Sequence, residues 1–137
     1  MSTGDLERGR LHDRHEAHVK AWNNFDLGAL GEIYDPDCHI FDTIPPPVFQ
    51  SLRDFLEHLT PRLQGFSRFR LRTFDRTIRV DERQNDRIAW ITSRYEAEAR
   101  RGAGVHRRCG RWTEIYEKRG EEWKLVHLHS SDDPNET

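Results

Sequence analysis

The chain has 137 residues, of which 34% are charged and 34% hydrophobic, and its formal net charge is −2. This length fits one domain, expected over residues 1–137, and the seven Phe, four Trp and three Tyr allow a small core built on large side chains. The near-neutral charge gives no reason to expect nucleic acid or an anionic membrane as a partner.

Cysteine content and the start of the chain bear on the compartment. Cys38 and Cys109 make neither a disulfide framework nor a Cys-x-x-Cys metal pattern. Residues 1–20 are charged throughout and do not resemble a signal peptide, and no apolar run is long enough to span a membrane. A reducing cytoplasm is therefore the expected compartment.

Three helices and one short strand are predicted in the first half of the chain. The helices are expected at 5–24, from Asp26 to Tyr34 and from Ser51 to Gly65, and the strand at 38–42. Asp26 and Ser51 are the expected N-caps of the second and third helices. Asp35-Pro36-Asp37 is expected to end the second helix, and the prolines at 45–47 to end the strand.

From Phe66 onward helical periodicity disappears and strands are predicted. They are expected at about 67–80, 86–98, 105–118 and 122–131, with turn residues between them. Helices followed by a long antiparallel meander predict an α+β design, in which the helices cover one face of the sheet. The core is expected over residues 8–131, with 132–137 as a frayed tail.

Three segments resemble those of a known superfamily. They are Ala21-Trp22-Asn23-Asn24-Phe25-Asp26-Leu27, Ile40-Phe41-Asp42 followed by prolines, and Trp123-Lys124-Leu125-Val126-His127-Leu128-His129-Ser130. Together with the order of elements, they resemble the nuclear transport factor two-like superfamily, which includes SnoaL-like and ketosteroid-isomerase-like domains. The last segment is similar to the closing strand of the calcium/calmodulin-dependent kinase association domain.

The resemblance implies a cone-shaped, cystatin-like fold with three N-terminal helices packed on a strongly bent antiparallel sheet. One face of such a sheet lacks helical cover, so a homodimer through the sheet is expected. The resemblance implies no single function, because the superfamily includes isomerases, polyketide cyclases, dehydratases and non-catalytic assembly modules.

Asp42 and His18 are the candidate catalytic residues. By the resemblance, Asp42 stands where steroid isomerases carry their general base, and His18 where they carry a tyrosine that donates to the enolate oxygen. Two other interpretations stay open: Asp42 can accept backbone hydrogen bonds before a proline turn, and the helix with His12 and His15 can simply be solvated. The isomerases' second donor, a protonated acid, falls near Cys109, where this chain has no carboxylate.

His127 and His129 form a pair on the last predicted strand. Residues two apart on a strand face the same side, about 7 Å from each other. Such a pair can bind a metal only with further ligands, for which Glu114 or Glu117 are the candidates. A structural or interface position facing outward, and a position in a pocket, are the competing interpretations.

The opposite face of that strand lines a cavity in the kinase association domain, and strand parity adds residues from the neighbouring strands. The expected pocket residues are Trp22, Ile40, Trp90, Thr92, Arg94, Glu114, Tyr116, Val126, Leu128 and Ser130. Arg94 and Glu114 can pair there, which gives a polar floor under aromatic walls.

The function expected from these residues is binding of a small hydrophobic carbonyl compound, with isomerisation, cyclisation or dehydration as the reaction. Asp42 is the expected base and His18 or Tyr116 the hydrogen-bond donor, and such proton transfer needs no cofactor. The alternative is a non-catalytic ligand-binding or oligomerisation module like the kinase association domain. The environment of Asp42 discriminates between the two.

Overall fold

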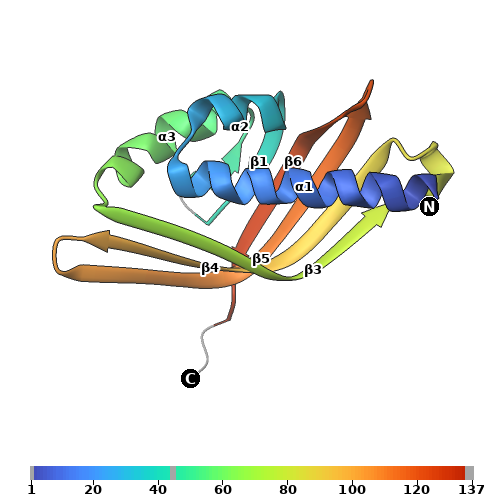
Figure 1. Cartoon of the computed structure of the whole chain (residues 1–137). Coiled ribbons are helices and arrows are strands. Elements are labelled where there is room, and N and C mark those ends of the chain that lie inside the picture. Colours follow the sequence, from blue (N-terminus) through green and yellow to red (C-terminus); the bar gives the residue numbers. More distant parts are fainter. Residues whose placement is uncertain (1, 44–45, 135–137) are drawn as a thin grey trace.

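The computed structural model describes residues 2–43 and 46–134, and it has the α+β architecture expected from the sequence (Figure 1). The described residues form α1 (Thr3–Asn24), α2 (Leu27–Ile33), β1 (Tyr34–Phe41), β2 (Val48–Phe49), α3 (Leu52–Gln64), β3 (Arg68–Val80), the 3-10 turn η1 (Glu82–Gln84), β4 (Ile88–Arg101), β5 (Gly104–Arg119) and β6 (Glu122–Asp132). Pro45 of the predicted proline run and residues 135–137 of the predicted tail lie outside the described residues.

Each of the three α-helices begins at a polar side chain. Ser2, Asp26 and Ser51 each accept a hydrogen bond from the backbone N–H three residues further on, which satisfies one of the free donors of the first turn. Phe25 takes a left-handed conformation with a φ of 48° and ends α1, so that α2 can start at once after it. The N-caps predicted at Asp26 and Ser51 are confirmed.

The first strand is longer than predicted. β1 begins at Tyr34, so the segment Asp35-Pro36-Asp37, expected to end the second helix, follows the end of α2 at Ile33 and lies inside the strand. Pairing of β1 with β6 is irregular between Tyr34 and His39. Proline is tolerated there because its missing N–H is not needed in an interrupted ladder.

The six strands form one sheet in the order β2-β1-β6-β5-β4-β3. Neighbouring strands are antiparallel except for β1 and β6, which run parallel. The prediction of a purely antiparallel sheet is therefore wrong for this pair. Parallel neighbours need a long connection, and here the connection contains α3 and the whole β3–β5 meander.

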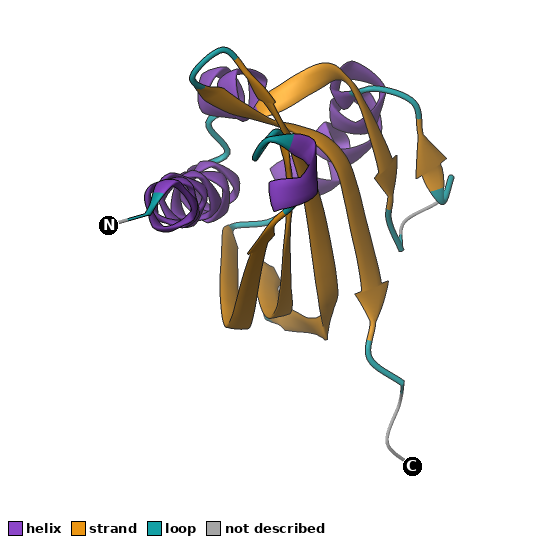
Figure 2. Cartoon of the chain, turned by 90° about the vertical axis from the view of Figure 1, so that its right-hand side faces the viewer, coloured by secondary structure: helices purple, strands orange, loops and turns teal. Residues whose placement is uncertain are grey.

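One face of the sheet is covered and the other is open. Along β4, burial alternates between Ile88 and Tyr95, with the odd-numbered residues buried and the even-numbered ones exposed. On the covered side α1 packs against β3, and α3 packs against β1 (Figure 1). Figure 2 shows α1 end-on beside the sheet. No helix of the described residues is long and apolar enough to cross a membrane.

A β-bulge in β6 changes which residues face the helices. Ile115 pairs with His127 and Tyr116 with Leu125, so Val126 is an extra residue without a partner on β5. As a result Leu125 and Leu128, three residues apart, are both buried against the core.

The sheet continues into the segment expected to be a frayed tail. Asp132 is the last residue of β6 and pairs with Gly110, and the backbone N–H of Asp133 donates to the carbonyl of Cys109 at 2.9 Å. The tail prediction is therefore wrong for these two residues, because backbone hydrogen bonds to β5 hold them.

Gly110 lies where β5 and the end of β6 approach most closely. A Cβ atom at Gly110 would stand 1.9 Å from the carbonyl oxygen of Ser131. We expect Gly110→Ala to lower the free energy of unfolding by at least about 2 kcal/mol, because a backbone atom cannot give way as a side chain does. Urea unfolding measures the change.

The matched control is Gly9→Ala on α1, where a Cβ atom meets nothing within 4 Å. The free energy of unfolding of this variant should rise by roughly 0.5–1 kcal/mol, since alanine has a higher helix propensity than glycine. Equal stability of Gly110→Ala and the wild type would contradict the close approach of the two strands.

Candidate functional site

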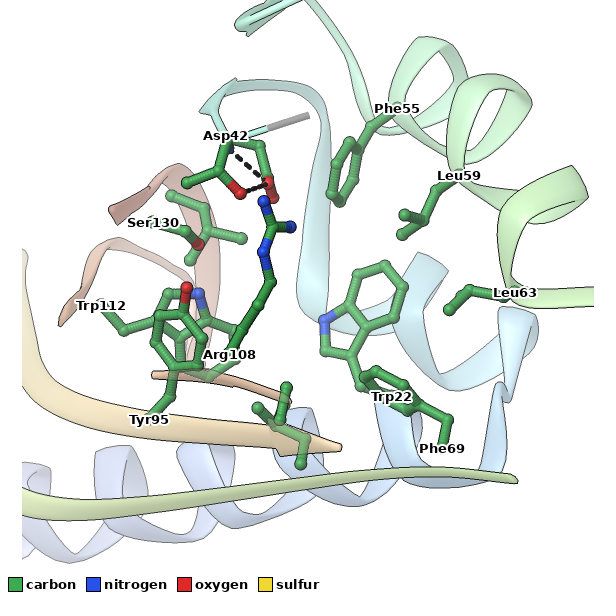
Figure 3. A pocket seen from close by; sticks show the side chains of 14 residues that line it. Trp22, Asp42, Phe55, Leu59, Leu63, Phe69, Tyr95, Arg108, Trp112 and Ser130 are labelled. Atoms are coloured by element: carbon green, nitrogen blue, oxygen red, sulfur yellow. Dashed lines mark hydrogen bonds between the residues drawn. The ribbon is translucent and has the colours of Figure 1, made fainter. Parts of the chain in front are cut away.

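A pocket of about 150 Å³ opens between α1, α3 and the covered face of the sheet (Figure 3). Its lining consists of Trp22, Asp42, Thr43, Phe55, Leu59, Leu63, Phe69, Leu71, Tyr95, Ala97, Arg108, Trp112, Leu128 and Ser130. A dry cavity of that volume holds a molecule the size of benzene. The pocket therefore suits a ligand with a single small ring or a short branched chain.

Aromatic and aliphatic side chains form the walls. α1 supplies Trp22, and α3 supplies Phe55, Leu59 and Leu63, which recur every four residues and so share one helix face. The rings of Trp22 and Phe55 meet edge to face, with 5.8 Å between their centroids. An apolar ligand can thus be desolvated on all of these sides.

The polar groups of the pocket gather around Asp42, which follows β1 directly. Asp42 is partly buried, and its Oδ1 accepts hydrogen bonds from the backbone N–H of Thr43 at 2.6 Å and from the Thr43 hydroxyl at 3.2 Å. Figure 3 shows the guanidinium of Arg108 extending toward Asp42, with Ser130 nearby. Arg108 also pairs with Asp132 at 3.4 Å.

Asp42 therefore shows features of both interpretations made from the sequence. Its Oδ1 is engaged by the turn that follows the strand, yet the side chain lines an apolar pocket beside a guanidinium. Among the described lining residues, Asp42 is the one carboxylate and Arg108 the one cation. This arrangement can take a proton from a bound molecule and balance the negative charge that results.

His18 lies behind the pocket wall and is not among the residues that line the pocket. His15 and His18 of α1 have no exposed surface, and both donate through Nδ1 to the carboxylate of Glu114, with 2.8 Å between His18 Nδ1 and Glu114 Oε2. The hydroxyl of Tyr116 donates to the same Oε2 at 2.5 Å. The open alternative of a solvated helix therefore does not apply to His15 and His18, which are both part of a buried polar cluster.

Glu114 is an ionised carboxylate at neutral pH despite its burial. Burial by itself would raise its pKa, but the hydrogen bonds from His15 and His18 outweigh this effect and bring the pKa to about 2. The pairing expected between Arg94 and Glu114 does not form. Arg94 lies on the open face and pairs with Asp133 at 3.1 Å.

The other predicted pocket residues separate into four groups. Trp22, Leu128 and Ser130 line the pocket, whereas Ile40 and Tyr116 are fully buried in the core. Val126 is the bulged residue of β6. Trp90, Thr92 and Arg94 are exposed on the open face, which corrects their assignment to the pocket.

The correction has one cause, the register of β4 against β5. Thr92 pairs with Thr113, and Ile91 pairs with Glu114, so it is Ile91 that shares the covered face with Glu114. Strand parity in the sequence predicts Thr92 on that face. A slip of one residue turns every side chain of a strand to the other side.

His127 and His129 lie outside the pocket with residues of β1. His39 pairs with His127 and Phe41 with His129, and the rings of His39 and His127 stack with 5.7 Å between centroids. Partial burial lowers the pKa of His127. The described residues contain no group of three His, Cys, Asp or Glu side chains that could hold a metal ion.

The sequence was compared with models of known protein families. A family model described as a SnoaL-like domain matches residues 13–134. None of the curated proteins matches this sequence significantly.

Solved structures share the fold at low sequence identity. A Novosphingobium aromaticivorans protein provisionally named a scytalone dehydratase has a TM-score of 0.81 and 12% identity, with 94% of this chain and 85% of that chain covered. A nuclear transport factor 2-like superfamily protein of Salmonella enterica serovar Typhimurium has a TM-score of 0.82 and 15% identity, with 96% of this chain and 94% of that chain covered. The CaMKII hub of S. rosetta has a TM-score of 0.78 and 16% identity, with 97% of this chain and 98% of that chain covered.

The low pKa of Glu114 predicts a pH-dependent contribution to stability. Its carboxyl has a pKa of about 2 in the folded chain against 4.5 as the reference, so its contribution is complete above pH 4.5 and disappears as the pH falls toward 2. We expect the free energy of unfolding of Glu114→Gln to be lower than that of the wild type by on the order of 3 kcal/mol at pH 7. This gap between the variant and the wild type should shrink below pH 4.5.

Urea unfolding from pH 7 to pH 3 measures this gap. Glu117→Gln, the loss of an exposed carboxylate on the same strand, is the control and should show a small, constant gap. A gap for Glu114→Gln that stays constant over the same range would contradict an ionised Glu114.

Proposed function

The chain belongs to the SnoaL-like domain family, and we propose that it binds a small hydrophobic carbonyl compound and catalyses proton transfer on it, with Asp42 as the base. The observation that carries the proposal is the presence of one carboxylate, Asp42, and one guanidinium, Arg108, among the described residues that line a mainly apolar and aromatic pocket. The apolar walls bind the carbon skeleton, and the two charged side chains act on the carbonyl end.

The proposed reaction begins with removal of a proton from the carbon next to the carbonyl. Asp42 takes the proton, the electron pair of the C–H bond forms a carbon–carbon double bond, and the π pair of the carbonyl moves to its oxygen to give an enolate. Arg108, and Ser130 beside it, are the donors that lie in the pocket and can stabilise the oxygen. They replace His18 and Tyr116, the donors expected from the sequence, which are engaged with Glu114.

Return of the proton from Asp42 to another carbon completes an isomerisation. If the adjacent carbon carries a hydroxyl group, that group can instead take the proton from Asp42 and leave as water while the enolate electrons form the new double bond, which completes a dehydration. The similarity to a protein provisionally named a scytalone dehydratase supports the second outcome as one to test. In this proposal the sheet bends into a cone around the ligand. The extra residues in β3 and β6, at the two register shifts, are features that favour such bending.

The proposal predicts exchange of the protons next to the carbonyl of cyclohexanone, whose ring fits the pocket. In D2O the protein should accelerate this exchange, measured by proton NMR. Asp42→Asn should lower the rate about 100-fold or more, because general base catalysis contributes roughly 10²–10⁴-fold. Binding of cyclohexanone, followed by saturation-transfer NMR, should persist.

The matched control is Asp37→Asn, which changes an exposed carboxylate on β1, the strand that Asp42 follows, and should leave the exchange rate unchanged. Equal exchange by Asp42→Asn and the wild type would show that Asp42 is not the base. Binding without exchange in the wild type would instead favour a non-catalytic ligand-binding module.

A second proposal concerns assembly through the open face of the sheet. Trp90, Ile115, His127 and His39 lie side by side across β4, β5, β6 and β1. Trp90 keeps 37% of its surface exposed, an unusual position for an indole on a monomer. Together with the similarity to a CaMKII hub, this supports a homodimer through the sheet as the assembly.

Trp90→Glu should therefore turn the dimer into a monomer, because it places a charge in the proposed contact, where it would be buried without a partner. Sedimentation velocity over a range of concentrations measures the change. Leu27→Glu, which alters a 48% exposed apolar residue on α2, is the control and should leave the dimer intact. A wild-type protein that stays monomeric at every concentration would refute this assembly.

A further inference from the structure

A polar cluster lies buried behind the pocket, and the proposed reaction does not use it. At its centre is Glu114, a carboxylate without exposed surface that accepts from His15, His18 and Tyr116. Among the described residues, no Lys or Arg donates to this carboxylate. A buried carboxylate without a counter-charge is strongly unfavourable, so a positive charge is expected inside the cluster itself.

Hydrogen-bond accounting decides the form of His18. Its Nδ1 donates to Glu114, and its Nε2 lies 3.0 Å from the indole Nε1 of Trp22 and 2.6 Å from the hydroxyl of Tyr34. An indole nitrogen can only donate. Tyr34 accepts from Trp22 at 3.2 Å, and burial raises the pKa of Tyr34 well above its usual range, so its own proton needs an acceptor. His18 Nε2 must therefore be unprotonated, and His18 is neutral.

His15 is free of this restriction and can carry the charge. Its Nδ1 donates to Glu114, and its Nε2 lies 2.9 Å from the hydroxyl of Thr73, which can accept a proton as well as donate one. The nearby carboxylate of Glu16 is already paired with Arg76 at 2.5 Å. The negative charge of Glu114 and the positive charge of His15 thus cancel, and the cluster as a whole has no net charge.

The cluster is connected to the pocket through two indoles that line it. Trp22 donates to His18 and so turns its one polar atom away from the ligand space. Trp112 stacks on the ring of His18, with 4.9 Å between centroids and 10° between planes. Both indoles therefore rest on a ring that Glu114 holds in place.

We propose that Glu114 is a positioning residue of the pocket, and that it acts through a charged His15 and a neutral His18 to hold Trp22 and Trp112 as an apolar inner wall. The role in ligand binding rests on the proposed function, whereas the protonation states do not. The cluster explains how an apolar wall is kept rigid: the polar atom of Trp22 is satisfied by His18, and the ring of Trp112 stacks on the same histidine.

Long-range proton–nitrogen NMR of the histidine rings at pH 7 tests the protonation states in the wild-type protein. We expect His18 with a protonated Nδ1 and an unprotonated Nε2, and His15 protonated on both nitrogens. A proton on His18 Nε2, or a neutral His15, would overturn the assignment. This measurement needs neither a ligand nor a variant, so it stands even if a substitution in the cluster prevents folding.

Glu114→Gln tests the positioning role, with Glu117→Gln as the control. In Glu114→Gln we expect a neutral His15, a weaker near-ultraviolet circular dichroism of tryptophan, and a Kd for cyclohexanone at least tenfold higher. Tryptophan signals and a Kd equal to those of Glu117→Gln would overturn the role. If cyclohexanone does not bind the wild type at all, the proposed function fails, while the tryptophan signal still decides the positioning role.

Discussion

The structure depends on one buried interaction, the contact of the Glu114 carboxylate with two histidines of α1. It joins the first helix to a central strand of the sheet almost a hundred residues later. Hydrophobic packing alone lets a helix slide or turn, whereas a buried charge with three donors has one satisfactory arrangement. The position of α1, and with it that of Trp22, follows from this contact.

Two carboxylates of the covered side have opposite surroundings, which suit the opposite roles proposed for them. Glu114 accepts three hydrogen bonds, has a pKa of about 2 and is sealed behind indoles, so it cannot exchange protons with a ligand. Asp42 is partly exposed at the pocket, beside a guanidinium. A helix-to-sheet anchor needs permanent charge, and a base needs access to its substrate. Separating the two by the wall of Trp22 and Trp112 meets both needs.

Local sequence features predicted the elements well, because caps, prolines and turn residues act over a few positions. Asp26 and Ser51 illustrate this. Site geometry was less accessible for two reasons. His15 and His18 count as polar in any hydrophobic pattern, although they lie on the buried face of α1, and their partner is distant in sequence. The face of each strand depends on register, and neither the pairing of Thr92 with Thr113 nor the bulge at Val126 has a local signal.

The bulge at Val126 also explains how one strand can serve two surfaces. With Val126 as an extra residue, Leu125 and Leu128 both face the core, while His127 and His129 stay on the outer side with the β1 residues. Ligand contacts and contacts with a second copy would then use opposite faces of the same strands. Substitutions on the open face change no pocket side chain. Assembly and ligand choice can thus vary independently, which fits a fold shared by a protein provisionally named a dehydratase and by a hub.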